Sequence, residues 1–155
     1  MLPKNSEVFE YYGALEEAEA LLARARLRVA DPQLQHILQR LQEAVRAAIT
    51  ALAAGRAPAA VTARLEPVLE ELGEPTGWLL AGCSEEEADL ALAAAQVRKA
   101  DRLLAAMAAK GLIDPGVAEQ ISALLATVAN ALFRARARLC GPDAGFRDSA
   151  RLLEG

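Results

Sequence analysis

Residues 78–104 read WLLAGCSEEEADLALAAAQVRKADRLL, a stretch that holds the start and most of the body of one long helix. Ser84 is followed three residues later by Glu87, which is the spacing of a capping box at a helix start. The three glutamates after Ser84 place negative charge where the helix dipole favours it. Alanine and leucine dominate the rest, and both are strong helix formers. We therefore predict a helix over about residues 85–110, preceded by a short apolar hook.

Composition favours the same kind of structure throughout the chain. Of the 155 residues, 54% are hydrophobic, but only 4% are aromatic, and alanine and leucine supply much of the apolar content. Such a composition is typical of long packed helices in a single domain. The formal net charge of −4 argues against a nucleic-acid partner. We find neither a signal peptide nor an apolar run of about 18 residues, so we expect a soluble cytoplasmic protein with no membrane partner.

Apolar stripes of helical period and capping signals divide the chain into five helices. Asp31-Pro32 and Asp114-Pro115 each combine a good N-cap residue with proline at the first helical position. Gly55 is a natural stop, and Pro67 predicts a later start or a kink in the third helix. The predicted helices span about residues 6–29, 32–54, 62–72, 85–110 and 115–139. The fold class is therefore all-α, an up-and-down helical bundle over residues 1–142 with a C-terminal tail at 143–155 and no strand.

Four segments resemble the ATP:cob(I)alamin adenosyltransferases of the propanediol-utilisation type. WLLAGCS at 78–84 is similar to that family's F-I-L-P-G-G-[ST] hook, and VRKADR at 97–102 is similar to its C-R-R-A-E-R segment. LLATVANALFRARAR at 124–138 resembles Y-L-N-R-L-S-D-L-L-F-x-L-A-R, and EYYGALEEAEALLARAR at 10–26 resembles the family's first long helix. The segments are collinear over nearly the whole chain. The resemblance implies a five-helix bundle of adenosyltransferase type.

This family resemblance also implies a trimer with active sites between subunits. There a reduced corrinoid meets ATP, the cobalt attacks the 5′ carbon, and triphosphate leaves as adenosylcobalamin forms. The corrinoid carries the difficult chemistry, and the protein supplies positioning and charge. The resemblance therefore leads us to expect cobalamin as the cofactor and a homotrimer as the assembly.

The departures from the family pattern concern ATP. The chain begins after the point where the family's T-x-T-G-D-x-G-x-T phosphate segment would end, and no other glycine-rich loop replaces it. Ala94 stands where the family has Arg, Ala126 where it has Asn, Thr127 where it has Arg, and Asn130 where it has Asp. Each charged hydrogen bond contributes roughly 1.5–3 kcal/mol, whereas micromolar binding amounts to only about 8 kcal/mol. We expect that ATP with Mg²⁺ does not bind in the family's way.

Three charged residues of the family's site set survive on the long helix. Arg98 and Arg102 are four residues apart and share a face, and Asp101, shortened from the family's Glu, sits beside them. They form either a remnant anion site or a structural ion-pair network at a subunit interface. We favour the structural interpretation because the residues that would complete the anion site are replaced.

Other candidate residues have a functional and a structural interpretation each. Trp78 and Phe133 could line a corrin pocket, although core packing is favoured. His36 could be an axial cobalt ligand, although a surface position is favoured. The arginines at 134, 136 and 138 could bind phosphate or an acidic partner, but a solvated helix end is favoured. The two cysteines, at 83 and 140, match no metal spacing, so we expect no metal site and two buried or idle thiols.

Three functions follow from the resemblance and its departures. The first is a corrinoid-binding or corrinoid-handling protein with a degenerate ATP site. The second is a working adenosyltransferase that takes its phosphate loop from a partner chain or binds ATP differently. The third is a structural or regulatory subunit that forms mixed trimers with an active paralogue.

Overall fold

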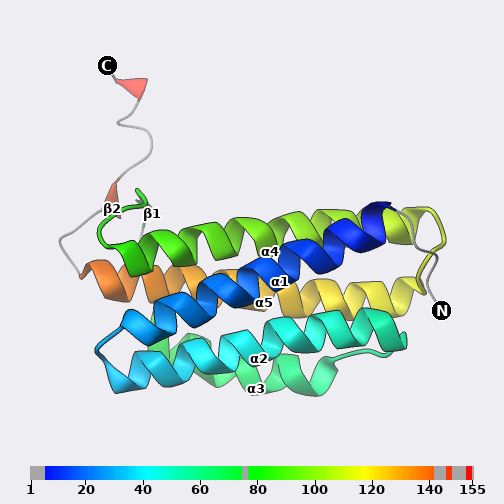
Figure 1. Cartoon of the computed structure of the whole chain (residues 1–155), viewed down its shortest axis with the longest axis horizontal. Coiled ribbons are helices and arrows are strands. Elements are labelled where there is room, and N and C mark those ends of the chain that lie inside the picture. Colours follow the sequence, from blue (N-terminus) through cyan, green and yellow to red (C-terminus); the bar gives the residue numbers. More distant parts are fainter. Residues whose placement is uncertain (1–5, 75–76, 142–145, 148–152, 155) are drawn as a thin grey trace.

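Five helices lie side by side along the long axis of the molecule (Figure 1). The computed structural model describes residues 6–74, 77–141, 146–147 and 153–154. Within these, the helices are α1 (Ser6–Arg28), α2 (Pro32–Ala54), α3 (Ala59–Leu72), α4 (Glu85–Ala109) and α5 (Pro115–Cys140). Helix α4 packs against α1 and α5, α2 packs against α1 and α5, and α3 lies mainly on α5. The predicted all-α bundle is confirmed.

The capping residues account for where the helices begin. The carboxylate of Asp31 accepts a hydrogen bond from the Gln33 N–H at 3.0 Å, and that of Asp114 accepts one from the Val117 N–H at 3.0 Å. Each satisfies one of the N–H groups that a first helical turn leaves without a partner. The helix that follows Asp31 ends at Gly55, whose φ of 63° is left-handed and suits glycine. The predicted bounds of α2 are therefore confirmed.

Helix α3 begins three residues earlier than predicted. Thr62 was the expected cap, but Pro58 occupies the N-cap position and the helix starts at Ala59. The ring of Pro58 restricts its own φ, which favours entry into a helix without a side-chain cap. Helix α3 also continues through Pro67, so the later start predicted from that proline is wrong.

Small side chains form much of the contact between α1 and α4. Ala18 and Ala25 on α1, and Ala93 and Ala100 on α4, are fully buried. Alanine at these positions lets the two helix backbones approach closely, as the interleaved alanines of the sequence predicted. Larger apolar residues from all five helices complete one continuous core.

A pair of two-residue strands is the departure from an all-helical chain. Strand β1 (Trp78–Leu79) pairs antiparallel with β2 (Phe146–Arg147), so that Trp78 faces Arg147 along the ladder. The prediction of no strand is therefore wrong at this one place. The pairing connects the segment before α4 with the tail after α5, at one end of the bundle (Figure 1). A helical tendency of the tail around residues 149–153 falls almost entirely outside the described residues.

Helix α5 is long and apolar enough, by length and composition, to cross a membrane, which corrects the expectation that no such run exists. It has 26 residues and its most apolar window has a mean hydropathy of 1.3. Core helices of bundles meet the same test, and α5 packs against α2, α3 and α4. Its character is that of the central helix of this bundle.

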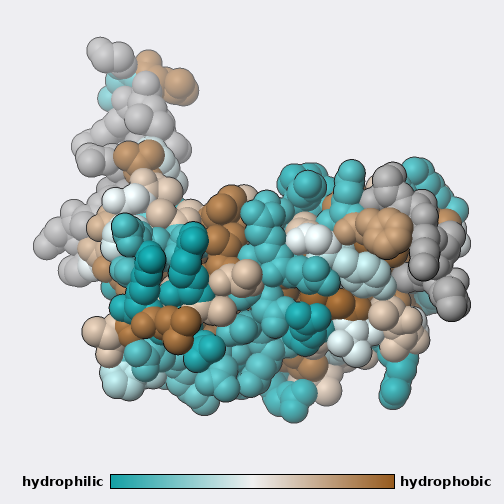
Figure 2. All heavy atoms as spheres, in the orientation of Figure 1, coloured by the Kyte–Doolittle hydropathy of each residue, from teal (hydrophilic) through white to brown (hydrophobic). Residues whose placement is uncertain are grey.

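The face seen in Figure 2 is mainly hydrophilic, with separate hydrophobic patches. Helices α1 and α4 carry three of the exposed large apolar side chains, Phe9, Leu27 and Leu92. Leu27 is the most exposed of these, at 77%. Single exposed apolar residues of this kind are normal on protein surfaces.

Candidate functional site

Asp101 lies at the contact between α4 and its neighbours. Its carboxylate accepts a hydrogen bond from the Ser122 hydroxyl of α5 at 2.6 Å, and it lies close enough to Tyr11 of α1 to raise the pKa of that phenol. Asp101 is half-buried, whereas Arg98 and Arg102 are exposed on the same helix. The prediction that the three form one charged cluster is therefore wrong in part, because Asp101 turns toward α5 and α1.

Arg98 and Arg102 present two guanidinium groups to solvent, one helical turn apart. Within the described part of the chain neither forms an ion pair, so their positive charge is not neutralised by a neighbour. The ion-pair network that we favoured for these residues was predicted at a subunit interface, and it stays a prediction. Two unpaired cations on one face remain able to contact an anion or a second subunit.

Tyr11 is the buried polar residue beneath this region. Its side chain is fully buried, and its hydroxyl donates to the Ala48 carbonyl of α2 at 2.9 Å. Burial, with the nearby Tyr12 and Asp101, raises the pKa of Tyr11 well above its usual value of 10. A neutral phenol is therefore built into the junction of α1, α2 and α4.

The raised pKa of Tyr11 predicts a loss of stability at high pH. An unfolded tyrosine loses its proton near pH 10, whereas folded Tyr11 retains it to higher pH, so above pH 10 the folded state binds more protons. The free energy of unfolding should then fall as pH rises, by up to about 1.4 kcal/mol per pH unit from this group. Urea unfolding between about pH 9 and pH 11.5 should show a shallower decline for Tyr11→Phe than for the wild type. Equal slopes would contradict the assignment.

Asn130 does not join the arginines of α4. It is exposed on α5, and its amide oxygen accepts a hydrogen bond from Arg134 Nε at 3.1 Å. The same guanidinium donates to the Leu69 carbonyl in the last turn of α3 at 2.7 Å. Asn130 is therefore part of a contact between α5 and α3, and the structure does not bring it together with Arg98 or Arg102.

The three arginines near the end of α5 each bind a different element. Arg134 reaches α3, Arg136 is buried against the start of α4, and Arg138 contacts Asp31 at 3.0 Å at the start of α2. The favoured interpretation of a solvated helix end is therefore wrong for Arg134 and Arg136, whereas Arg138 is exposed as expected. Sequence reasoning could not find these partners, because they lie 49 or more residues away along the chain.

Trp78 and Phe133, the predicted corrin-pocket residues, are both half-buried. Trp78 belongs to β1, and its indole N–H is buried without a hydrogen-bond partner among the described residues. Phe133 lies on α5, about two turns before that helix ends. In the single chain, therefore, neither side chain offers a fully exposed apolar face to a ligand.

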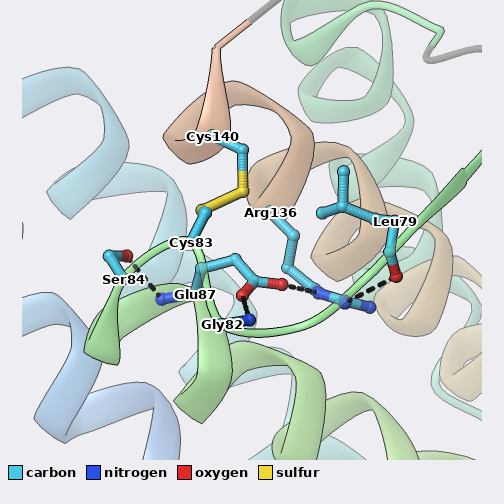
Figure 3. Close-up of a disulfide and its surroundings, with 7 residues drawn as sticks. All are labelled: Leu79, Gly82, Cys83, Ser84, Glu87, Arg136 and Cys140. Atoms are coloured by element: carbon cyan, nitrogen blue, oxygen red, sulfur yellow. Dashed lines mark hydrogen bonds and ion pairs between the residues drawn. A yellow bond between two sulfur atoms is a disulfide. The ribbon is translucent and has the colours of Figure 1, made fainter. Parts of the chain in front are cut away.

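The two cysteines form a disulfide, which overturns the expectation of idle thiols. Cys83 and Cys140 are 57 residues apart in sequence, yet their Cα atoms are 5.7 Å apart and their sulfurs are bonded (Figure 3). The bond joins the segment before α4 to the last residue of α5. The sulfurs and a Glu87 oxygen all lie within 4.8 Å of one another, which is a possible ligand set. With both sulfurs bonded to each other, however, only the carboxylate is available, and no metal site is assigned.

Glu87 anchors the start of α4 from inside the protein. Its carboxylate is fully buried, accepts a hydrogen bond from Arg136 Nε at 2.8 Å, and accepts another from the Gly82 N–H at 2.6 Å (Figure 3). Ser84 Oγ accepts the Glu87 N–H at 3.1 Å, as predicted for the capping box. The reciprocal bond differs from the prediction, because the carboxylate binds Gly82 rather than the N–H of Ser84. Glu87 thereby holds α4, α5 and the preceding segment together.

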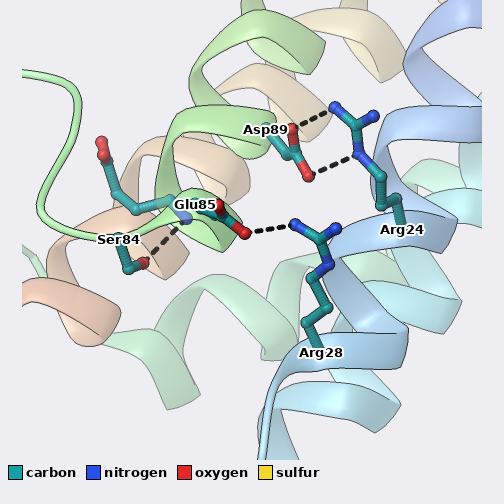
Figure 4. Close-up of polar contacts among 6 residues, drawn as sticks. Arg24, Arg28, Ser84, Glu85 and Asp89 are labelled. Carbon is teal, nitrogen blue, oxygen red and sulfur yellow. Dashed lines mark hydrogen bonds and ion pairs between the residues drawn. The ribbon is translucent and has the colours of Figure 1, made fainter.

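Two further ion pairs join the same end of α4 to α1 (Figure 4). Arg24 donates two hydrogen bonds to the buried carboxylate of Asp89, at 2.9 and 2.5 Å, and this contact raises the pKa of Arg24. Arg28 donates to Glu85 at 2.7 Å in an exposed position. The bidentate pair fixes the orientation of α1 on α4 more strictly than the exposed one.

Three grooves on the described surface lie away from the residues above. Two, of about 360 and 350 Å³, share Arg26 and Gln39 on the α1–α2 side, and the second also includes His36. A third, of about 460 Å³, lies between α2 and α3. Apart from His36, no residue considered for corrinoid or ATP binding lines these three grooves. His36 is exposed in a polar groove, as we favoured.

These observations define an all-α helical bundle in which ion pairs and hydrogen bonds between side chains join the helices. The family model for cobalamin adenosyltransferase matches residues 1–133. The chain therefore belongs to the cobalamin adenosyltransferase family. No curated protein matches the chain.

Proposed function

We propose that this chain is a corrinoid-binding member of the propanediol-utilisation type with a degenerate ATP site, working as a homotrimer in the cytoplasm. One observation carries the proposal. The positions that resemble the family's other charged or amide site residues hold Ala94, Ala126, Thr127 and Asn130, none of which is charged. Of the residues that match the family's charged site set, Arg98 and Arg102 are exposed and form no ion pair with another described residue.

The surroundings of the replaced positions support the loss of ATP contacts. Ala94 is buried in the core, so it offers no polar group to a ligand. Thr127 donates its hydroxyl to the Ala123 carbonyl of its own helix at 2.9 Å, and Asn130 is engaged by Arg134. Two solvated arginines, without further fixed donors, give little of the preorganised charge that triphosphate binding requires.

The corrinoid part of the proposal needs a second copy of the chain. Trp78 and Phe133 are half-buried here, and a flat macrocycle requires larger apolar walls than one half-buried face supplies. A neighbouring subunit would add the opposite wall, and Arg98 and Arg102 would face a corrinoid's polar side groups or that subunit. The family membership makes cobalamin the substrate to test first.

Two titrations test the proposal on the purified protein. Cobalamin should change its visible absorbance saturably on addition of protein, whereas calorimetry with Mg-ATP should show no saturable binding in the micromolar range. Arg98→Gln/Arg102→Gln should weaken the cobalamin response, and Arg56→Gln, at an exposed arginine in the loop after α2, is the matched control. Micromolar ATP binding would overturn the degenerate site, and an unchanged cobalamin spectrum would overturn corrinoid binding.

A working adenosyltransferase is the second candidate, and the unpaired Arg98 and Arg102 favour it. A partner chain could add further phosphate-binding groups beside these two arginines. Conversion of cob(I)alamin to adenosylcobalamin by the purified protein, with ATP, would establish this candidate. Copurification with an active paralogue, together with a changed turnover rate of that paralogue when this chain is added, would instead support mixed assembly, in which this chain has a structural or regulatory part.

A further inference from the structure

We propose that the Cys83–Cys140 disulfide is a redox-controlled clasp that fastens the hook, residues 78–83, to the end of α5. Cys83 is the last residue of the hook, immediately before the N-cap Ser84, and Cys140 is the last residue of α5. Figure 3 shows the hook running past the helix end, with the disulfide at one side and Arg136 at the other. The inference rests on the cytoplasmic location proposed above, and its test is made without corrinoid, so that it can fail or succeed independently of corrinoid binding.

Apart from the disulfide, few contacts with other described residues fasten the hook. Leu79 is buried, and its carbonyl accepts a long hydrogen bond from Arg136 at 3.5 Å. The Gly82 N–H donates to Glu87, and β1 contributes a two-residue pairing. Leu80 is 60% exposed, and its neighbour Ala81 is exposed as well. A segment with so little buried apolar area opens locally far more readily than the bundle unfolds.

The disulfide is placed where a reductant can reach it. Cys83 is exposed and Cys140 is half-buried, at the surface end of both helices. Disulfides in a reducing compartment are typically redox-sensing or catalytic, and not permanent. The exposure of Cys83 and the weak attachment of the hook beside it favour the sensing role.

The chemistry is a thiol–disulfide exchange with a dithiol reductant. A thiolate of the reductant attacks Cys83 Sγ, the S–S bond breaks, and Cys140 leaves as a thiolate that takes up a proton. The second thiol of the reductant then displaces Cys83, which is protonated in turn. The protein gains two electrons and two protons, and the reductant becomes a disulfide.

The fluorescence of Trp78 can report the opening of the clasp. Trp78 is the single tryptophan of the chain, begins the hook, and is half-buried with its indole N–H enclosed. When the hook detaches from the end of α5, this indole becomes exposed to water. Its emission then moves to longer wavelength and becomes more accessible to a soluble quencher, while the helices remain in place.

The experiment compares the full-length oxidised protein with the same protein reduced by dithiothreitol. Reduction should shift Trp78 emission to longer wavelength and accelerate hydrogen exchange of hook peptides by about tenfold or more, with unchanged far-ultraviolet circular dichroism. The variant Cys83→Ser/Cys140→Ser should behave like the reduced protein and ignore the reductant. The reduced wild type needs no substitution, so the test stands even where that variant folds poorly.

Two results would overturn the clasp. In the first, Trp78 fluorescence and hydrogen exchange of the hook peptides stay unchanged although mass spectrometry shows two free thiols. In the second, the disulfide remains intact in a large excess of reduced glutathione, and such a bond would be a fixed structural link that could not respond to redox conditions.

Discussion

Glu87→Ala is expected to lower the free energy of unfolding by about 3–5 kcal/mol, because it leaves Arg136 buried without its counter-ion. The carboxylate is completely buried and also accepts the Gly82 N–H, so its loss leaves a second donor unsatisfied. Few polar side chains among the described residues are as deeply buried as this pair. Denaturant unfolding at neutral pH measures the effect.

A neighbouring ion pair supplies the control. Glu85 lies two residues earlier and pairs with Arg28 in an exposed position, so Glu85→Ala should cost no more than about 1 kcal/mol. Glu87→Leu/Arg136→Met should recover much of the loss, because removing both charges leaves none uncompensated. A Glu87→Ala loss as small as that of Glu85→Ala would contradict the buried ion pair.

Loss of the disulfide is expected to lower the free energy of unfolding of the bundle about as much as Glu87→Ala does. Cys83 and Cys140 close a loop of 57 residues that contains α4 and α5, and a cross-link of this length restricts the unfolded chain by roughly 4 kcal/mol. Dithiothreitol should lower the urea midpoint of the wild type, whereas Cys83→Ser/Cys140→Ser should have the lower midpoint with and without it. Equal midpoints for oxidised and reduced wild type would show that the bond does not form or does not stabilise the fold.

Local signals in the sequence explain why most helix bounds could be predicted. Asp31-Pro32, Asp114-Pro115 and Gly55 act through bonds to residues within four positions, so their meaning is visible in the sequence. Pro58 was missed because it starts α3 without a side-chain cap, and the sequence offered Thr62 as a more familiar cap. The apolar stripes and capping signals together indicated an up-and-down bundle, and the family resemblance specified a bundle of adenosyltransferase type.

The candidate site was less accessible to prediction, because it depends on pairs that are distant in the sequence. The bonding of Cys83 to Cys140, and of Glu87 to Arg136, follows from how α4 and α5 align, which no local pattern reports. Arg98 and Arg102 could be placed on one face from their spacing alone. The turning of Asp101 toward Ser122, away from the arginines, again depends on the neighbouring helix.

The cross-links between α4 and α5 follow a single alignment. A step of four residues from Cys83 to Glu87 matches a step of four back from Cys140 to Arg136. The fourteen residues from Glu87 to Asp101 match the fourteen from Arg136 back to Ser122. Inserting or deleting one residue within either span would therefore misplace several links together, unless the other helix changed by the same amount. Insertions and deletions are then confined to the turn between the two helices. Within α4 and α5, we expect that a change in the length of one helix is accepted only with an equal change in the other.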